Sequence, residues 1–416
     1  MPQIVLLVLL LCLLAIPAFT DALRLADGRP LVGCYFFGHW WEPWTSDDNA
    51  MERDHIRVGQ MGVNTLFYDH EFSQSRHNNW KYLDREYKFA EAHNFMILPW
   101  LELKCGADLA SHRAEALSYY GTETPMSEDA QGRPNNALLW DMRYQDLLYL
   151  YCCEYLDRYW GRPGLLRLQW EGKVRPAVAL SVEVGWDGAG YDEATQQRFR
   201  AWLKAKYGSL DKLNQAWGTQ YASFEAVDPR DTARFPYPTD EVTPVPQTTQ
   251  DHAHFRAEVV NAAMDAIKQR LLRNYPDLLI IAEVPYPPGW KHPHAVGYSY
   301  GAASFLETVT YADIVVFRTA GPSSLNAEGL IPFRARGQKL VFAHRTGQGG
   351  LEADVRNQTL LDGYVRQALD WAEGVGFYSW NEMGDCAMVS NERAEGLIST
   401  YTRFFHQWAR QVDRQR

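Results

Sequence analysis

The chain has 416 residues, with 51 acidic against 41 basic side chains and a formal net charge of −10. Hydrophobic residues make up 46 % and charged residues 22 %, which excludes wholesale disorder and is typical of a globular protein with a large core. The acidic balance argues against a nucleic-acid partner, because such partners select concentrated basic surfaces. Aromatic residues, at 13 %, are the unusual class, since they suit either a large core or a site where Trp and Tyr rings stack on sugars.

The amino-terminal segment predicts a secretory signal peptide over residues 1–22. Residues 4–16 are uniformly apolar, and Pro17, Ala18 and Thr20 follow, as in an apolar stretch before a cleavage site. This stretch is shorter than the ~20 residues needed to span a bilayer, so no integral membrane domain is expected. We therefore expect a secreted or periplasmic protein whose folded part is residues 23–416.

Eight short apolar runs alternate with longer amphipathic patterns and predict parallel strands joined by helices. Each run is rich in Val, Ile, Leu and aromatic residues and is bounded by polar or turn residues, as buried parallel strands are. The predicted strands cover residues 31–37, 63–68, 95–101, 177–182, 278–282, 313–317, 339–343 and 375–380. The predicted helices cover residues 49–61, 80–93, 143–160, 193–207, 210–217, 254–275, 360–373 and 392–412.

Eight strands, most of them followed by a helix, favour an α/β fold of the (β/α)8 TIM-barrel type in a single domain. An open doubly wound sheet is the alternative, but no Gly-rich phosphate-binding fingerprint follows the first strand. Two long loops are expected, at residues 104–141 and 222–251, the second with five prolines. Long loops at the carboxyl ends of barrel strands usually form the substrate site.

Carboxylates, His, Arg and Trp gather where the predicted strands end. Charged groups at the end of an apolar strand are costly to bury unless they are paired or used. Any one of them alone fits a structural ion pair, but the whole ring favours a carbohydrate site, because glycoside hydrolysis needs two carboxylates and sugar rings stack on aromatic rings. The candidate substrate-binding residues are Trp40, Asp69, His70, Glu71, Trp100, Glu102, Trp186, Arg318, His344, Arg345, Trp380, Asn381 and Asp385.

Residues 181–219 resemble the family-42 β-galactosidases and their clan of barrel glycosidases. The similar stretches are SVEVG from Ser181, FRAWL from Phe199, KYGSL from Lys206 and LNQAWGT from Leu213. In that family the Glu that ends strand four is the acid/base, so the resemblance implies this role for Glu183.

Two positions depart from the clan pattern. Val182 stands where the clan usually has an Asn directly before the acid/base. The clan's nucleophile is a Glu that ends strand seven, whereas the predicted strand seven here ends in His344 and Arg345. The resemblance therefore leaves the second catalytic carboxylate unassigned.

A second resemblance involves the two chain ends. Residues 33–37 with Trp40 and Trp41, together with the SWNEMGD run from Ser379, resemble the family-99 endo-mannosidases and their relatives. That family carries two carboxylates in a similar motif on the last strand. The resemblance implies that Glu382 and Asp385 occupy their places.

Three interpretations follow. The first is a glycoside hydrolase that cleaves O-glycosidic bonds with Glu183 as general acid/base and Glu382 or Glu283 as its partner. The second keeps the enzyme class but uses Glu382 and Asp385. The third is a barrel that binds glycans without cleaving them, which the missing strand-seven Glu favours.

A zinc hydrolase built on His39, His70 and His344 is disfavoured, because no HExxH or similar local spacing occurs. Five cysteines follow the predicted signal peptide, an odd number without paired metal-ligand spacing, which favours buried free thiols. No metal or cofactor is therefore expected. The sugar, the linkage, the stereochemical outcome and the oligomeric state stay open.

Overall fold

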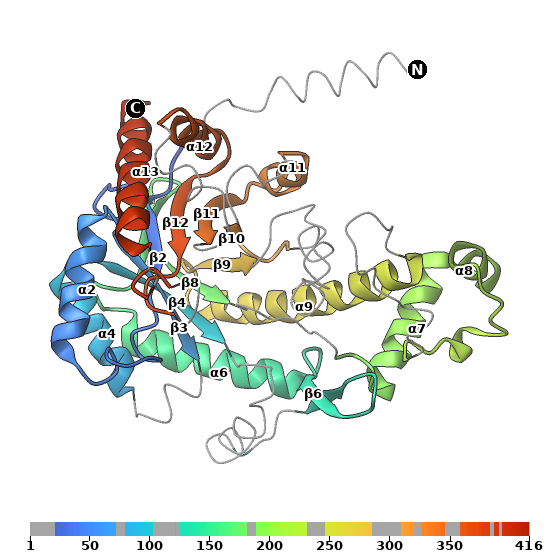
Figure 1. The fold of residues 1–416 in the computed structure, drawn as a ribbon. Helices are drawn as coiled ribbons and strands as arrows, with labels where there is room; N and C mark the ends of the chain where they lie inside the picture. The colour runs from blue at the N-terminus through green and yellow to red at the C-terminus, as the bar shows by residue number, and fades with distance from the viewer. Residues whose placement is uncertain are drawn as a thin grey trace.

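The computed structural model describes residues 21–71, 80–102, 121, 125–180, 189–230, 246–284, 309–319, 327–345, 358–382, 387–390 and 393–415. Across these residues, parallel strands pair in the order β2, β3, β4, β8, β9, β10, β11 and β12, and β12 pairs back onto β2 (Figure 1). Their bounds are β2 (Val32–Tyr35), β3 (Thr65–Glu71), β4 (Met96–Glu102), β8 (Lys173–Leu180), β9 (Leu279–Val284), β10 (Ile314–Thr319), β11 (Lys339–Arg345) and β12 (Gly374–Tyr378). The closed ring confirms the predicted (β/α)8 barrel, and the alternative of an open sheet is wrong.

Helices connect and surround the strands. Figure 1 shows α7 and α8 beyond the barrel, next to one end of the long helix α9. The helices are α2 (Asp48–Gln60), α4 (Lys81–Ala92), α6 (Met142–Tyr159), α7 (Glu193–Tyr207), α8 (Leu210–Trp217), α9 (Gln247–Asn274), α11 (Ala327–Ala335), α12 (Gln358–Trp371) and α13 (Ala394–Arg414). Every helix predicted from the sequence is confirmed to within two residues at each end, except α9.

Helix α9 begins at Gln247, whereas the sequence predicted a loop through residue 251 and a helix from residue 254. Tertiary contacts hold its polar first turns. Asp251 is fully buried and accepts hydrogen bonds from Lys206 Nζ and Trp217 Nε1, both at 2.8 Å. Such contacts stabilise a helix where local propensity does not, which is why the sequence pattern missed this part.

Several short elements were not predicted. β1 (Arg24–Leu25) pairs with β7 (Arg167–Trp170), and β7 pairs with β8, so that an antiparallel ribbon lies at the amino end of the barrel. β5 (Met126–Glu128) and β6 (Pro134–Ala137) form a hairpin inside the predicted loop at residues 104–141. These strands are too short to show a clear alternation of apolar residues. Helix α11 contains Pro332, a residue that normally signals a helix end.

Strand side chains alternate between two apolar clusters. One cluster, with members from all eight barrel strands, fills the barrel interior, and the other fills the layer between strands and helices. In β3, for example, Phe67 faces the interior, whereas Leu66 and Tyr68 face the helices. This period of two decides which strand-end side chains can meet inside the barrel.

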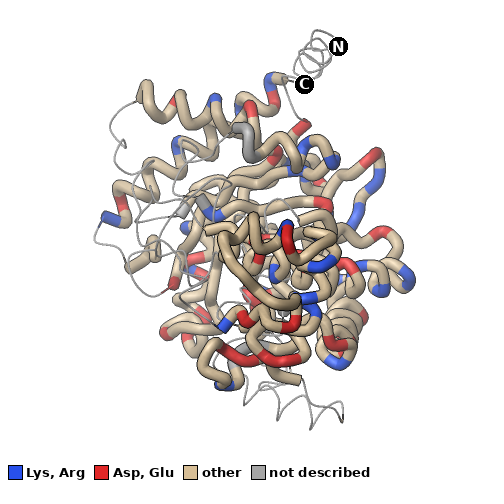
Figure 2. The backbone as a smooth tube through the Cα atoms, turned by 90° about the vertical axis from the view of Figure 1, so that its right-hand side faces the viewer, with Lys and Arg blue, Asp and Glu red and all other residues tan. Residues whose placement is uncertain are grey.

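Most of the predicted signal peptide lies outside the described residues. None of the helices in the described ranges is both long enough and apolar enough to cross a bilayer. Cys34 and Cys152 are buried free thiols, as the sequence favoured, whereas Cys105 and Cys386 lie outside the described residues. Acidic and basic positions are interspersed along the described chain (Figure 2).

Closure of the barrel requires a close approach of β12 to β2. A Cβ added at Gly376 would lie 2.7 Å from the Gly33 carbonyl oxygen, a backbone atom that cannot rotate away. We predict that Gly376→Ala lowers the free energy of unfolding by about 1–3 kcal/mol, as measured by urea unfolding.

The control for this variant is Gly396→Ala on α13, where an added Cβ meets nothing within 4 Å. This change is expected to leave the stability unchanged or raise it by up to about 1 kcal/mol, because Ala favours the helix. Equal unfolding midpoints for the two variants would contradict the proposed close contact.

Candidate active site

A buried ion pair lies inside the carboxyl end of the barrel. Glu283 on β9 and Arg318 on β10 follow Ile281 and Val316 on the inward-facing side of their strands. The Arg318 guanidinium contacts the Glu283 carboxylate, and the Tyr35 hydroxyl donates to Glu283 Oε1 at 3.4 Å. The Arg318 side chain is 7 % exposed and the Glu283 side chain is 0 % exposed. Because both charges are buried, each one offsets part of the cost of burying the other.

Tyr378 connects this pair to a second carboxylate. The Arg318 guanidinium lies over the Tyr378 ring, 4.7 Å from its centroid, and the Tyr378 hydroxyl donates to Glu382 Oε1 at 2.6 Å. Ser379 Oγ donates to the other Glu382 oxygen at 3.3 Å. Glu382 is half-buried. The structure thus brings together two of the predicted catalytic carboxylates, Glu283 and Glu382.

Two buried N–H donors in this region have no hydrogen-bond acceptor among the described residues. Trp100 is 2 % exposed and meets the Tyr35 ring edge-on at 4.5 Å, and its Nε1 lacks an acceptor. Asn381 accepts a hydrogen bond from the Phe37 backbone at 2.7 Å through Oδ1, whereas its Nδ2 lacks an acceptor. Because an unpaired buried donor costs about 1–3 kcal/mol, each of these two donors calls for an acceptor that the described residues do not supply.

Asp69 and Trp40 lie at the same end of the barrel. Asp69 follows the inward-facing Phe67 by two residues, which places it on the same side of β3, and it is 8 % exposed. Trp40 is half-buried, and its ring packs against the interior cluster. Both positions suit the substrate-binding roles predicted for them.

His70 faces the helices instead. Its Nε2 contacts Glu86 Oε2 at 2.7 Å and its Nδ1 contacts the Tyr155 hydroxyl at 2.6 Å, while His39 Nδ1 contacts the other Glu86 oxygen at 2.5 Å. Burial by itself raises the pKa of Glu86, but the contacts with His39 and His70 outweigh it and hold this pKa below its usual value. Burial lowers the pKa of His70. The network joins α4 to the segment that follows β2.

His344 and Trp380 also face the helix layer. His344 Nδ1 contacts the Tyr401 hydroxyl on α13, and Trp380 is fully buried with the Arg57 guanidinium 5.5 Å from its ring. The structure therefore does not bring His70, His344 and Trp380 into the barrel interior. His70 and His344 occupy outward positions in the alternation of their strands, whereas Trp380 lies two residues beyond the end of β12 and packs in the helix layer.

The other candidates lie outside the described side chains. Glu183, Trp186 and Asp385 lie outside the described residues, and of Glu71, Glu102 and Arg345 only the backbone is described.

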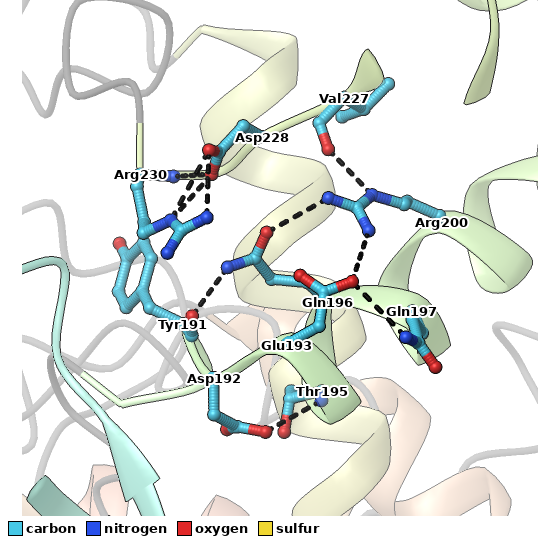
Figure 3. A network of polar contacts seen from close by, with 10 residues as sticks. All are labelled: Tyr191, Asp192, Glu193, Thr195, Gln196, Gln197, Arg200, Val227, Asp228 and Arg230. Atoms are coloured by element: carbon cyan, nitrogen blue, oxygen red, sulfur yellow. Dashed lines mark hydrogen bonds and ion pairs between the residues drawn. The ribbon is translucent and has the colours of Figure 1, made fainter. Parts of the chain in front are cut away.

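The described chain that resumes at residue 189 is anchored by polar contacts. Asp192 caps α7 by accepting a hydrogen bond from the Thr195 backbone at 2.8 Å (Figure 3), and it also accepts one from Ser127 Oγ on β5 at 2.7 Å. Arg200 donates to the Val227 carbonyl at 2.9 Å and to the exposed Glu193 at 3.0 Å (Figure 3). These bonds fix the start of the α7–α8 arm.

Three of the stretches that carry the family-42 resemblance, FRAWL, KYGSL and LNQAWGT, build this arm. Lys206, Tyr207 and Trp217 all donate to the buried carboxylate of Asp251 on α9. Asn214 Oδ1 accepts hydrogen bonds from the Tyr221 backbone at 2.8 Å and from a threonine hydroxyl at 2.9 Å, and so holds the chain beyond α8. Within the described residues these stretches are therefore structural, and they lie against α9 beyond the barrel (Figure 1).

Three residues that make these contacts, two in the barrel interior and one in the helix layer, were not predicted from the sequence. Tyr35 and Tyr378 line the interior, but an aromatic residue inside an apolar run looks like core. The available signals were sequence positions near a strand end. Tyr35 lies two residues before Phe37, and Tyr378 lies directly before the SWNE motif. Glu86 lies within a predicted helix, where a charged residue is usually exposed to solvent. Only its place on the buried face of α4 distinguishes it from such a residue.

Comparisons with known proteins support the family resemblance locally. The model of the glycoside hydrolase family 42 β-galactosidases matches residues 176–298, which is less than half of the chain. The β-galactosidase Bga of Halorubrum lacusprofundi is 43 % identical over 44 residues, which are 9 % of this chain and 6 % of that protein. A β-amylase of Bacillus cereus is 38 % identical over 63 residues, which are 14 % of this chain and 12 % of that protein. The chain thus matches only a small part of the length of these relatives.

Solved structures match most of the chain. Gan42B, a GH42 β-galactosidase from G. stearothermophilus, superposes with a TM-score of 0.62 at 14 % identity, over 95 % of this chain and 58 % of that chain. The catalytic domain of the β-amylase from Paenibacillus polymyxa superposes with a TM-score of 0.57 at 16 % identity, over 89 % of this chain and 97 % of that chain. These likenesses confirm the barrel fold, and together with the family match they confirm the predicted resemblance to barrel glycosidases of this clan.

The interior ion pair yields a stability prediction. Arg318→Met removes the guanidinium and leaves the Glu283 carboxylate buried, which should cost about 3–5 kcal/mol of unfolding free energy. The double variant Arg318→Met/Glu283→Gln should recover most of this loss. Chemical unfolding of the two variants measures both values, and a double variant that is as unstable as the single variant would refute the proposed pairing.

The outer network yields a pH prediction. The folded-state pKa of Glu86 lies below its unfolded value of about 4.3, so its stabilising contribution is present above that pH and is lost as the pH falls. Glu86→Gln should therefore destabilise the fold more at pH 6 than at pH 3 in urea unfolding. The control Glu395→Gln removes an exposed carboxylate that pairs with Arg57 and should change stability by less than about 1 kcal/mol at both pH values. A pH-independent effect of Glu86→Gln would contradict the assignment.

Proposed function

We propose that this chain is a secreted glycoside hydrolase that cleaves O-glycosidic bonds of an oligo- or polysaccharide at the carboxyl end of its barrel. The family match over residues 176–298 and the shared fold support the enzyme class. The signal-peptide pattern of residues 1–22 supports secretion or a periplasmic location.

The single observation that carries the proposal is the arrangement around Trp100. Its buried Nε1 has no acceptor among the described residues, and its ring contacts Tyr35, whose hydroxyl donates to Glu283. A sugar hydroxyl would satisfy the Trp100 donor, and the half-buried Trp40 ring at the same end of the barrel would contact the apolar face of the sugar. Glu382 belongs to the same linked group of side chains through Arg318 and Tyr378, and it supplies one of the two carboxylates that glycoside hydrolysis requires.

The contacts assign different roles to the two described carboxylates. Glu283 is held by Arg318 and is completely buried, which suits a group that orients its neighbours and balances charge. Glu382 is half-buried and receives a hydrogen bond from Tyr378, which suits a carboxylate that reaches the substrate. We therefore propose Glu382 as the catalytic partner of Glu183.

In this mechanism Glu183 donates a proton to the glycosidic oxygen as the bond to the anomeric carbon breaks. At the same time Glu382 either attacks the anomeric carbon, which gives a glycosyl-enzyme ester that a water deprotonated by Glu183 then hydrolyses, or removes a proton from a water that attacks the anomeric carbon directly. A separation of ~5–5.5 Å between the two carboxyl groups implies retention of anomeric configuration, and ~6.5–9.5 Å implies inversion. Proton NMR of the first-formed product distinguishes the two outcomes.

The comparisons favour two substrate classes, β-galactosides and starch-type α-glucans. The family model and Gan42B are β-galactosidases, whereas the structure that this chain covers almost completely is a β-amylase domain. The substrate-binding set proposed from the sequence is compatible with either. Parallel assays on lactose-type and maltose-type oligosaccharides decide between them, and hydrolysis of mannosides alone would favour the family-99-like alternative with Glu382 and Asp385.

Glu183→Gln should lower kcat/KM by about 10²–10⁴-fold on whichever glycoside is cleaved, because it removes the proton donor while preserving the shape of the side chain. Glu193→Gln, ten residues further along the chain and exposed on α7, should keep normal activity. Near-normal turnover by Glu183→Gln would overturn the assignment. Absence of hydrolysis by the unaltered chain across all these linkages, with glycan binding retained, would favour the non-catalytic alternative.

A further inference from the structure

A pocket of about 760 Å³ lies at the amino end of the barrel, opposite the carboxylates described above. Besides Asp21 and Ala22, which belong to the predicted signal peptide, its wall is formed by Leu23 and Arg24, by the turn between β7 and β8 at residues 169–174, by Gly337 and Lys339 before and within β11, and by the end of α13. This volume falls within the ~300–1,000 Å³ of typical small-molecule sites. Nothing in the proposed catalytic mechanism uses this end of the barrel.

The walls of this pocket are tied together. The Arg24 guanidinium, which is largely buried, donates to the Gly28 carbonyl and to Asp413 on α13, both at 2.9 Å. β1 pairs with β7, so the amino-terminal wall and the β7–β8 turn belong to one ribbon. The pocket is therefore largely preformed, which lowers the ordering cost of binding.

The lining chemistry suits a neutral, hydroxyl-rich ligand. Trp170 and the half-exposed Val174 supply apolar surface. Gln169, Glu171 and Lys173 supply an amide, a carboxylate and an ammonium group from the same turn. Charges of both signs disfavour a polyanion or a polycation, whereas an aromatic ring beside mixed donors and acceptors matches a saccharide.

The backbone of the β7–β8 turn supports a functional role. Glu171 has a φ of 49°, in the left-handed region, and Gly172 follows with a φ of 77°. Gly, Asn or Asp usually occupies the first of these positions in such a turn, because other residues are strained there. The chain instead keeps a carboxylate at the pocket wall, and strain of this kind concentrates at ligand-binding sites.

We propose that this pocket is a second, non-catalytic saccharide-binding site, which holds a neutral polysaccharide chain while the opposite end of the barrel acts on it. Trp170 stacks on a sugar ring, and Glu171 and Lys173 bond its hydroxyls. The proposal rests on the proposed glycoside hydrolase function for its substrate class, but binding at this pocket is measured without catalysis.

Affinity electrophoresis of the intact chain, in gels that contain soluble starch or β-1,4-galactan, tests the site. The unaltered chain and Glu382→Gln should be retarded by at least one of the two polysaccharides, whereas Trp170→Ala should lose most of the retardation. Trp202→Ala, a half-buried Trp on the distant α7–α8 arm, is the matched control and should be retarded normally. Trp170→Ala should keep its kcat/KM on a small chromogenic glycoside.

Glu171→Gly provides a second test that does not depend on an altered Trp. Removal of the side chain relieves the backbone strain that the positive φ of residue 171 causes, and should therefore raise Tm. It should nevertheless weaken polysaccharide binding by about tenfold, because one charge-assisted hydrogen bond is lost. A variant that is less stable and binds less would instead indicate a structural role and would overturn the proposal.

Two further outcomes overturn the site and leave the proposed function intact. They are unaltered retardation of Trp170→Ala and Glu171→Gly, or no retardation of the unaltered chain by either polysaccharide. Conversely, retardation that depends on Trp170 in a chain that hydrolyses no glycoside would refute the proposed function and keep the binding site.

Discussion

β12 can pair with β2 because Gly33 and Gly376 let two backbones approach where a Cβ would lie 2.7 Å from a carbonyl oxygen. That contact, with the pairing of β8 and β9, closes the ring of strands. Once the ring is closed, successive side chains along each strand point alternately into the barrel interior and into the helix layer. Glu283, Arg318 and Tyr378 meet because they occupy inward positions at the same end of the barrel.

The closed barrel buries two carboxylates in different ways. Glu86 lies in the helix layer, where two histidines contact it, and its contacts serve the fold. Glu283 lies in the interior, where Arg318 compensates its charge and a Tyr378 contact leads on to the half-buried Glu382. A buried pair contributes little net stability compared with apolar packing of the same volume. The interior pair is therefore better explained by chemistry at the site than by stability.

The strands and most helices could be predicted from the sequence, because buried parallel strands leave apolar runs and exposed helices leave amphipathic ones. The start of α9 could not, since the buried Asp251 is stabilised there by Lys206 and Trp217 from a different part of the chain. The ribbon of β1 and β7 could not be predicted either, because strands of two and four residues are too short to show an alternation of apolar and polar residues.

The candidate site was predicted only in part, because a strand-end residue is functional only when its side chain faces inward. Trp100 and Arg318 do so, but His344 and His70 fall on the other side of the alternation. Trp380 lies beyond the end of β12, where the alternation no longer applies, and packs in the helix layer. Tyr35 and Tyr378 were missed for the converse reason, since their hydroxyls act within runs that look like core. A shift of one residue in register reverses such an assignment, and only the paired strands determine it.

The central claim is that the carboxyl end of the barrel holds a saccharide between Trp100 and Glu382. The most direct measurement is a crystal structure of the Glu183→Gln variant with a bound oligosaccharide. The account predicts a sugar ring inside this end of the barrel, with an oxygen that accepts the Trp100 Nε1 hydrogen bond and the Glu382 carboxylate facing the scissile bond. A saccharide bound only elsewhere, with Trp100 Nε1 bonded to a protein group, would contradict the account.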